Sequence, residues 1–313
     1  MFAGAMLVAM AVDAVLGWPD RIYDRIGHPV TWIGELITRA ELRFNPSSQP
    51  FWRRRLNGVA VCLGVTAMAA FIAQLIVWSL PHGPWGSVLT GVFAWPLVAS
   101  RSLHDHVRKV AVPLARGDLQ GARDAVAMIV GRDPATLDTA GVARAALESL
   151  AENASDGVVA PLFWGVLLGL PGIAAYKAIN TMDSMIGHMS PRYRAFGWAA
   201  ARLDDVVNLI PARLTALLFV VVAGSGWRSA LKVVIADAGH HRSPNAGWPE
   251  AAMAGALGIR LSGPRVYDGQ MSAEPWVNAG GPDPSAMDLG RGLNLYLASV
   301  LALAGVIAVV ALI

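Results

Sequence analysis

Long apolar stretches alternate with polar, arginine-rich stretches along the 313 residues of the chain. Gly58 to Leu80 carries no formal charge, and Leu293 to Ile313 is uncharged from end to end. A helix needs about 20 apolar residues to cross a hydrocarbon core of about 30 Å. Both stretches therefore predict membrane-spanning helices.

Three further apolar runs are short or are interrupted by residues that break helices or are unfavourable in lipid. They are Trp85 to Ala99, Val158 to Tyr176 and Val206 to Gly224. Pro171 and Gly172 interrupt the second run, so we expect it to be broken or re-entrant. Together with the two clear runs, these segments predict four to six membrane segments.

The N-terminal run from Phe2 to Trp18 is also apolar and has the length of a secretory signal. It lacks a basic N-terminal region and carries Asp13, so we expect it to be retained as part of the protein.

Composition agrees with a membrane protein and excludes several other classes. Hydrophobic residues make up 55% of the chain and charged residues 15%, which is too apolar for an ordinary soluble domain. The net charge of +3 is spread over several loops without a nucleic-acid-binding motif, so nucleic acid is not an expected partner. The single cysteine, Cys62, excludes an internal disulfide and a cysteine-based metal cluster.

The arginine-rich loops give an orientation. Residues 19 to 57 carry seven arginines, among them Arg53, Arg54 and Arg55, against four acids. The positive-inside rule places this loop in the cytoplasm. We predict a mainly α, polytopic helical membrane protein whose residues 1–313 form one membrane-embedded domain, with a soluble, cytoplasmic helical insert at 101–157 and a loop-rich peripheral segment at 225–292.

Local signals predict the structure of these two segments. Asp118 is placed to cap a helix that Gly131 would end, and a second helix is expected from about Asp138 to Asn153. Residues 266–267 precede the turn-forming residues Asp268 and Gly269, which predicts loops or a small hairpin.

The first polar motif ends the insert. Steps of four place Arg144, Glu148, Glu152 and Asp156 on one helix face. A solvated helix face with an Asn/Gly cap is one interpretation of this motif. Acids at a helix C-terminus oppose the helix dipole, however, and these acids adjoin an apolar run where a carboxylate is costly. Both features favour a functional site.

The second motif follows the broken run. Lys177, Asn180 and Asp183 recur at i, i+3 and i+6, so a helix presents an ammonium, an amide and a carboxylate on one side, with Met182, Met185 and Ile186 on the other. A salt-bridged amphipathic helix remains the alternative.

The third motif opens the next apolar run. Arg202, Asp205 and Asn208 share a face, and Arg213 lies about one turn inside hydrophobic sequence. An arginine in such a position needs an anionic partner, which would be a phosphate or a carboxylate. An internal ion pair of Arg213 with Asp205 or Asp204 is the alternative to a phosphate.

The fourth motif runs from His240 to Glu250 and precedes an alanine-rich helix. Arg242, Ser243 and Asn245 near the start of that helix could hold a phosphate, although an ordinary loop and cap would use the same residues. The chain contains no phosphate-binding loop, dinucleotide motif, zincin motif or hydrolase elbow.

An ordered series of short motifs covers nearly the whole chain. The series comprises Asp13 with Leu16 and Gly17; His28, Pro29 and Val30 with Ile33 and Gly34; Glu152 and Asn153 with Ser155, Asp156 and Gly157; Tyr176 and Lys177 with Asn180 and Asp183; Arg202, Asp204 and Asp205; and Ser243, Pro244 and Asn245 with Pro249 and Glu250. It resembles the adenosylcobinamide-phosphate synthase family (CbiB/CobD). One position departs from the family pattern, because Trp18 precedes Pro19 where an acid is commoner.

The resemblance implies an ATP-dependent ligase of cobalamin biosynthesis in the inner cell membrane. Such an enzyme joins a carboxylate of adenosylcobyric acid to the amine of aminopropanol phosphate and forms an amide. The implied partners are this corrinoid, the amine phosphate, ATP as co-substrate, Mg²⁺ and the lipid bilayer. A homo-oligomer and contacts with other cobalamin-assembly membrane enzymes stay open.

The resemblance also suggests roles for the motif residues. Carboxylates supply the oxygen ligands that Mg²⁺ requires, cations neutralise phosphate charge, and a base accepts the proton of the amine. The catalytic candidates are Glu152 as the base, Asp156, Lys177, Asn180 and Asp183. The metal candidates are Asp156, Asp183 and Asp205, and the substrate- or phosphate-binding candidates are His28, Arg202, Asn208, Arg213, Arg242, Ser243 and Asn245. We expect the acids and bases of the first three motifs to converge in one site.

Two other classes share part of this pattern. A transporter or channel also places ionisable residues beside broken helices, and a corrinoid-binding scaffold needs polar loops without an acid cluster. Acids next to bases in three separate motifs favour catalysis over both.

Overall fold

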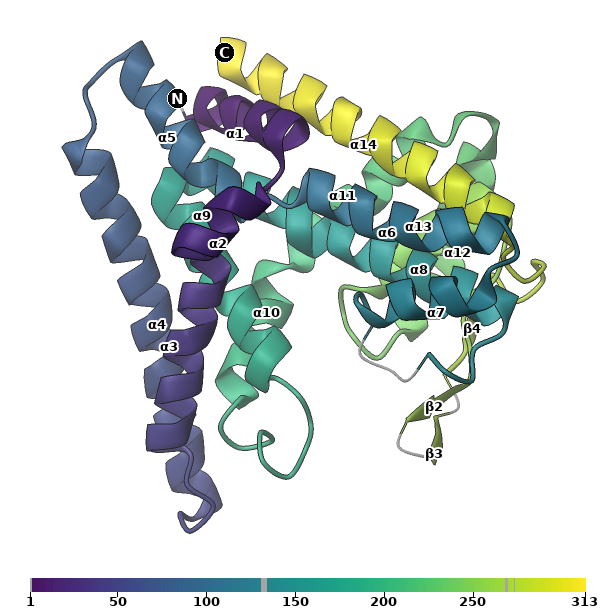
Figure 1. Ribbon diagram of the computed structural model, residues 1–313, viewed down its shortest axis with the longest axis horizontal. Coiled ribbons are helices and arrows are strands. Elements are labelled where there is room, and N and C mark those ends of the chain that lie inside the picture. Colours follow the sequence, from purple (N-terminus) through teal and green to yellow (C-terminus); the bar gives the residue numbers. More distant parts are fainter. Residues whose placement is uncertain (1, 131–133, 268–269, 273) are drawn as a thin grey trace. The chain divides into compact units, whose positions relative to one another are not determined.

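The computed structural model describes residues 2–130, 134–267, 270–272 and 274–313. The described chain is largely helical (Figure 1). Its strands form two antiparallel pairs, β1 (Leu261–Ser262) with β4 (Trp276–Val277) and β2 (Arg265–Tyr267) with β3 (Gln270–Ser272). The predicted mainly α fold is confirmed.

The chain folds into two compact units. Unit 1 consists of Met1–Ala99, Ala160–Asn208 and Val306–Ile313, and unit 2 consists of Ser100–Val159 and Leu209–Gly305. This division does not test the expectation of one membrane-embedded domain, which stays a prediction.

Unit 1 is built from helices of the N-terminal third and of the middle of the chain. These helices are α1 (Phe2–Leu16), α2 (Asp20–Ile26), α3 (Pro29–Phe44), α4 (Phe51–Ser79), α5 (Pro84–Ala94), the 3₁₀ turn η1 (Trp95–Leu97), α9 (Ala160–Ile186) and α10 (Trp198–Val207). The long helix α4 runs beside α3 (Figure 1) and also packs against α9 and α10.

The core of unit 1 is formed where α9 meets α3, α4 and α10. Met182 and Ile186 of α9 pack there with Ile37 of α3 and Cys62 of α4. The predicted apolar side of the second motif is therefore confirmed. Because Met182 and Ile186 turn inward, Lys177, Asn180 and Asp183 are carried on other sides of the helix.

Two glycines let the loop between α9 and α10 approach neighbouring backbone closely. A Cβ at Gly58 of α4 would overlap the carbonyl of Phe196, and a Cβ at Gly197 would overlap the carbonyl of Ile186. Both positions therefore exclude larger residues, and the loop is fixed against α4 and the end of α9.

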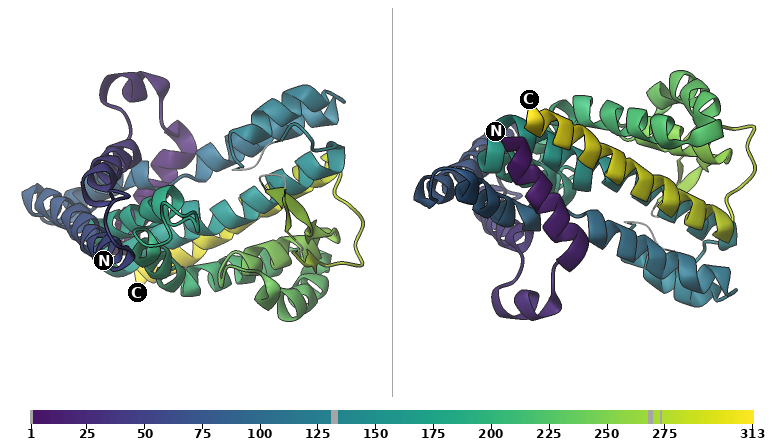
Figure 2. Two further views of the ribbon diagram at one scale, coloured as in Figure 1. Left: turned by 90° about the horizontal axis from the view of Figure 1, so that it is seen from below. Right: turned by 90° about the horizontal axis from the view of Figure 1, so that it is seen from above.

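Unit 2 combines helices with the short strands. Its helical elements are α6 (Ser100–Ala115), α7 (Leu119–Ala127), α8 (Thr139–Ala154), the π turn η2 (Ser155–Val159), α11 (Leu209–Val222), the 3₁₀ turn η3 (Gly224–Gly226), α12 (Trp227–Asp237), the 3₁₀ turn η4 (Ala238–His240), α13 (Gly247–Leu257) and α14 (Ala286–Leu312), whose last residues belong to unit 1. In the further views α14 is a continuous yellow helix (Figure 2).

The local predictions for unit 2 hold where they can be checked. Asp118 caps α7 through Gly121 N at 2.9 Å, and Asp138 caps α8 through Gly141 N at 2.7 Å. Strands β2 and β3 confirm a small hairpin, while the predicted turn residues 268–269 and the predicted helix stop at Gly131 lie outside the described residues.

Three helices of the described chain are long and apolar enough to cross a membrane, and five candidates result if each of two bent helix pairs counts as one span. The three are Phe51–Ser79, Thr139–Ile186 and Ala286–Leu312. The first and the third cover the two clear runs of the sequence except for the last residue of each. The segment predicted at Trp85 to Ala99 is not among them, because α5 has only 11 residues before the chain tightens into η1 at Pro96.

The apolar run before the second motif is broken, as Pro171 predicted. Gly169 has a φ of 68° inside α9, a left-handed conformation that side chains other than glycine adopt at a cost. Leu170 and Pro171 then start the second part of the helix. A second irregularity, the π turn over Ser155–Val159, contains Asp156.

Candidate functional site: two clusters of buried carboxylates

Unit 1 contains a hydrogen-bonded network around one buried carboxylate, that of Asp204. The Tyr176 hydroxyl donates to Asn208 Oδ1 at 2.9 Å, and Asn208 Nδ2 donates to Asp204 Oδ2 at 2.9 Å. Asn180 Nδ2 approaches the other oxygen, Asp204 Oδ1, at 3.4 Å. Asp204 is only 8% exposed, so these neutral donors replace water around its carboxylate.

Helix periodicity explains how four residues reach one point. Tyr176 and Asn180 lie one turn apart on α9, and Asp204 and Asn208 lie one turn apart at the end of α10. The packing of α10 on α9 then brings the two pairs together. Within the described residues, Asp204 forms no ion pair, which leaves its charge unneutralised by any arginine or lysine.

The predicted candidates Lys177 and Asp183 lie on the same helix as Asn180, and both are half-buried. Asp183 is close enough to Asp204 for the two carboxylates to repel each other electrostatically. Two neighbouring carboxylates can bind a cation together, since a cation is attracted to both and offsets their mutual repulsion.

Asp205 and Arg202 form an ion pair of their own beside this network, and Asp205 is close enough to act electrostatically on Asp204. Arg202 Nη1 pairs with Asp205 Oδ2 at 3.1 Å on the surface of α10, and the Arg202 side chain is well exposed. The structure therefore places Asp204, which was not among the predicted ligands, where Asp205 was expected. A role for Asp205 in metal binding stays a prediction.

His28 caps a helix. Its Nδ1 accepts a hydrogen bond from Val30 N at 3.2 Å, and its backbone N–H donates to Thr31 Oγ1 at 3.1 Å, which together start α3. The ring packs edge-on against Trp18 with centroids 4.8 Å apart. Lys177 is near enough to act electrostatically on this ring, so His28 borders the same polar region while serving as a cap.

Unit 2 holds the arginine of the third motif. Arg213 Nη1 donates to Leu209 O at 2.8 Å and contacts Asn245 Oδ1 at 3.3 Å. The guanidinium lies over the Trp248 ring at 4.3 Å. Among the described residues of its own unit, Arg213 forms no ion pair. The alternative interpretation, an ion pair with Asp204 or Asp205, involves residues of unit 1 and is not tested.

The fourth motif forms a cap at the start of α13. Ser243 Oγ accepts hydrogen bonds from Asn245 N at 3.2 Å and Ala246 N at 3.3 Å, and His241 Nδ1 accepts from Ser243 N at 3.0 Å. These contacts match the ordinary loop and cap. Arg242 is exposed and lies 3.9 Å from Glu274 Oε1. Phosphate binding by Arg242, Ser243 and Asn245 stays a prediction.

A second cluster of buried carboxylates lies deeper in unit 2, and the sequence did not mark it as a site. Ser262 N donates to Glu148 Oε1 at 2.7 Å, and Ser262 Oγ donates to Glu250 Oε2 at 3.1 Å. His241 Nε2 lies 3.8 Å from Glu250 Oε1. Ser262 holds both acids because its backbone is left-handed, with a φ of 58°.

The four residues expected on one helix face end in different surroundings. Arg144 pairs with Asp283, Glu148 is buried against Ser262, Glu152 is exposed, and Asp156 is half-buried in the π turn. The π turn adds a residue to the helical repeat and so shifts Asp156 off the face of Glu152. Glu152 matches the solvated-face interpretation, whereas Glu148 does not.

No group of three or more His, Cys, Asp or Glu side chains in the described part of the chain is arranged to hold a metal ion. Mg²⁺ is commonly bound through one or two carboxylates together with substrate phosphates. Asp183 and Asp204 fit that requirement, and Asp156 belongs to the other unit. Convergence of the predicted acids in one site is not tested.

These features define a helical membrane protein that carries buried polar clusters beside apolar helices. Comparison with known proteins shows the family of the chain. The family described as CobD/CbiB protein matches residues 6–296, and the chain belongs to this family. The resemblance found in the sequence is thereby confirmed.

Relatives match over the full length of the chain. A protein of Rhodobacter capsulatus named "Cobalamin biosynthesis protein CobD" is 59% identical over 310 residues, covering 99% of this chain and 98% of its own. Proteins of the same name from Brucella suis and Sinorhizobium sp are 47% and 45% identical, covering 96% and 98% of this chain and 94% and 98% of their own. No solved structure matches the chain.

Proposed function

We propose that this protein is the ATP-dependent ligase of cobalamin biosynthesis that joins adenosylcobyric acid to aminopropanol phosphate, as a multi-pass enzyme of the inner cell membrane. Membership of the CobD/CbiB family supports the pathway, since the relatives are named for cobalamin biosynthesis. The buried Asp204 network of unit 1 is the observation that carries the enzymatic assignment.

The argument from this network is energetic. Burying a carboxylate among neutral donors costs free energy compared with leaving it in water. Such carboxylates are therefore found more often at functional sites than elsewhere in a protein. On α9, Lys177, Asn180 and Asp183 all lie within two helical turns of Tyr176, a member of this network. An ammonium, an amide and two repelling carboxylates form a suitable receptor for a phosphate with its cation.

The reaction sets the roles. Activation transfers a phosphoryl or an adenylyl group from ATP to an oxygen of the corrinoid carboxylate. The amine nitrogen then attacks the acyl carbon, phosphate or AMP leaves with that oxygen, and the surplus amine proton passes to a base, for which Glu152 is the candidate. Lys177 would neutralise the charge that develops on the transferred phosphate.

Mg²⁺ would supply charge neutralisation for the phosphates of ATP. In unit 1 its fitting ligands are Asp183 and Asp204, because both provide hard oxygen donors and they are close enough to act on each other electrostatically. Asn180 and Asn208 would hold the Asp204 carboxylate in a fixed orientation.

A second phosphate-binding region is proposed around Arg213. Its Nη1 is used by Leu209 and Asn245, and stacking on Trp248 fixes the guanidinium plane. The remaining N–H donors of the fork would then be presented to an anion without a large loss of side-chain entropy. The phosphate of the amine substrate has the matching charge.

The test is a reconstitution with purified full-length protein in detergent. Corrinoid acid, aminopropanol phosphate, ATP and Mg²⁺ are incubated together, and the amide and the nucleotide product are quantified by mass spectrometry. The proposal expects amide formation that requires ATP, with ADP or AMP released in equal amount. Asp204→Asn should lose this activity, whereas Asp24→Asn on the exposed face of α2 should retain it.

The rival classes give different results in the same assay. A corrinoid-binding scaffold would bind the corrinoid acid, shown by its absorbance co-eluting with the protein, and would form no amide. A transporter would form no amide in detergent and would move substrate into proteoliposomes. Either result would refute the ligase.

A further inference from the structure

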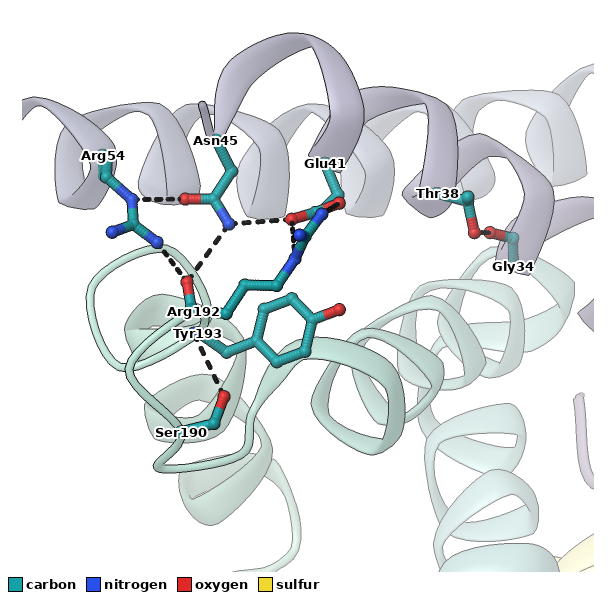
Figure 3. Close-up of polar contacts among 8 residues, drawn as sticks. All are labelled: Gly34, Thr38, Glu41, Asn45, Arg54, Ser190, Arg192 and Tyr193. Carbon is teal, nitrogen blue, oxygen red and sulfur yellow. Dashed lines mark hydrogen bonds and ion pairs between the residues drawn. The ribbon is translucent and has the colours of Figure 1, made fainter. Parts of the chain in front are cut away.

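The polar end of the α3–α4 pair is organised around an ion pair between the exposed Arg192 and the buried Glu41. Arg192, in the loop between α9 and α10, forms two hydrogen bonds to Glu41, from Nε to Oε1 at 2.9 Å and from Nη2 to Oε2 at 2.8 Å (Figure 3). Asn45 Nδ2 donates to Glu41 Oε1 at 2.9 Å, and Arg54 Nε donates to Asn45 Oδ1 at 2.6 Å. We call Glu41, Asn45, Arg54 and Arg192 the clamp.

The clamp leaves positive charge uncompensated. Its one carboxylate is used by Arg192, and the Glu41 pairing raises the pKa of Arg192, so that arginine stays charged. Among the described residues, the partners of Arg54 are an amide oxygen and the carbonyl of Arg192, and neither carries a charge. A cavity of about 570 Å³ borders the clamp and is lined further by Ser47 and Ser48. Its volume is that of a small-ligand site.

Four more arginines lie within two positions of a clamp residue in the sequence, and none forms an ion pair with a described residue. They are Arg43, Arg53, Arg55 and Arg194, which we call the arginine collar. Three of them stack on aromatic rings: Arg43 on Phe44 at 6.0 Å, Arg55 on Trp198 at 3.8 Å and Arg194 on Phe51 at 5.7 Å. Exposed arginines on exposed aromatic rings are typical of a membrane–water interface.

The depth of the collar follows from the helix that carries it. Trp52 and Trp78 are 62% and 68% exposed near the two ends of α4. Between them an exposed stripe continues at steps of three and four through Leu56, Ala60, Leu63, Ala67, Phe71 and Leu75. Tryptophans mark the two interfaces of a spanning helix, so Arg53 and Arg55, next to Trp52, lie at the level of the lipid headgroups.

We infer that the arginine collar and the adjoining cavity bind the phosphate of an anionic phospholipid, whose acyl chains lie along the exposed stripe of α4. Three observations point to this occupant. The collar arginines form no ion pair with a described residue, two of them lie at the start of α4 where the helix dipole favours anions, and the exposed apolar stripe of α4 continues from there. The inference does not depend on the proposed ligase activity.

The test is lipid binding to the delipidated full-length protein in detergent, followed by native mass spectrometry. The probes are phosphatidylglycerol, phosphatidylcholine with the same acyl chains, and inorganic phosphate. We expect phosphatidylglycerol to be retained about tenfold more strongly than phosphatidylcholine. Millimolar inorganic phosphate should not displace it, since phosphate lacks the acyl chains.

Arg43→Gln with Arg53→Gln removes two collar charges and leaves every clamp contact in place. This variant should lose on the order of tenfold in preference for phosphatidylglycerol. The matched control, Arg108→Gln with Arg116→Gln, removes two exposed charges in unit 2, one from α6 and one from the turn that follows it, and should keep the preference. Unchanged thermal unfolding of both variants verifies that the fold is intact.

Three outcomes would overturn the inference. Equal retention of the two lipids would mean that charge does not select the occupant. Equal losses in the variant and its control would mean that net charge acts without a site. Displacement of phosphatidylglycerol by inorganic phosphate would identify a site for a free anion in place of a lipid.

Discussion

The two units both bury carboxylates, and they do so by different means. In unit 1 the partners of Asp204 come from helix positions one turn apart, and every donor is a side chain. In unit 2 Glu148 and Glu250 are joined by one residue, Ser262, which uses its backbone N–H for the first and its hydroxyl for the second. One network depends on helix packing and the other on a single strained turn.

This difference determines which substitutions each network tolerates. The donors around Asp204 can be altered one at a time, because the helices that carry them are held by the core around Met182 and Phe196. Ser262 has no substitute, since only its left-handed backbone presents both donors to the two acids. Unit 1 therefore offers variants that test chemistry, and unit 2 offers variants that test stability.

The largest effect is expected from Asp204→Asn. The amide keeps the shape, but it has one acceptor oxygen where the carboxylate offers two to Asn180 and Asn208, and it removes the charge available to a cation. We expect ligation to fall on the order of a hundredfold or more. The measurement is amide formation by the purified variant.

Asp205→Asn is the matched control for that experiment. It removes the same charge one residue away, from an exposed pair with Arg202, and should cost little in stability. If Asp205→Asn abolished ligation and Asp204→Asn did not, Asp205 would be the functional acid, as the sequence suggested, and the Asp204 network would be structural.

The next effect concerns stability in unit 2. Glu148→Ala removes the acceptor of a buried backbone N–H and should lower the free energy of unfolding by about 1 to 3 kcal/mol. Glu152→Ala, one turn further on the same helix, alters an exposed residue and should change it by less than about 0.5 kcal/mol. Thermal unfolding in detergent compares the two variants.

The same pair sharpens the assignment of the base. Glu152→Ala should lose ligation while its melting temperature is kept, since a base contributes to the reaction and not to the fold. A Glu152→Ala enzyme with normal turnover would remove Glu152 from the mechanism.

A smaller effect is expected at Arg213. Arg213→Lys keeps the charge but loses the planar fork that lies over Trp248 and reaches Asn245, so activity should fall about tenfold with the fold intact. Arg228→Lys is the control, because Arg228 also lies over a tryptophan, Trp227, at 5.3 Å. Equal turnover in both variants would make Arg213 a structural residue.

The smallest effect is a pH dependence of stability in unit 2. The pKa of Asp283 lies below its usual range, chiefly because Arg260 donates hydrogen bonds to its carboxylate. Arg144 makes a further contribution. Because the pKa of Asp283 is lower in the folded state, its ionised form stabilises that state at pH values above the unfolded pKa of about 3.9. This stabilisation is lost as the pH falls through the folded-state pKa. Wild type and Asp283→Asn should therefore differ slightly in melting temperature near pH 6 and converge below about pH 3. A gap that widened on acidification would contradict this assignment.

Sequence patterns predicted what depends on local spacing. The caps at Asp118 and Asp138, the helical face that carries Lys177 and the break near Pro171 were all expected, because each follows from residues within a few positions of one another. The family was expected as well, from motifs in a fixed order.

The remaining features depend on contacts between distant residues. Glu148 and Ser262 are far apart in the chain, and nothing in the local sequence announces the left-handed backbone that joins them. Asp204 and Asp205 are neighbours with the same side chain, and only the packing of α10 on α9 decides which one is buried. The π turn shifted Asp156 for a similar reason, since periodicity assumes a regular helix.

The tryptophans at the ends of α4 have a consequence for bilayer thickness. Trp52 and Trp78 are about 39 Å apart along the helix axis at 1.5 Å per residue, close to the thickness of a bilayer with its headgroup regions. Short acyl chains would force α4 to tilt, and the loop between α9 and α10 would tilt with it because Gly58 and the clamp hold the two together. Since that loop leads into the helix that carries Asp204, the proposed ligase activity should depend on the chain length of the lipid in which the protein is reconstituted.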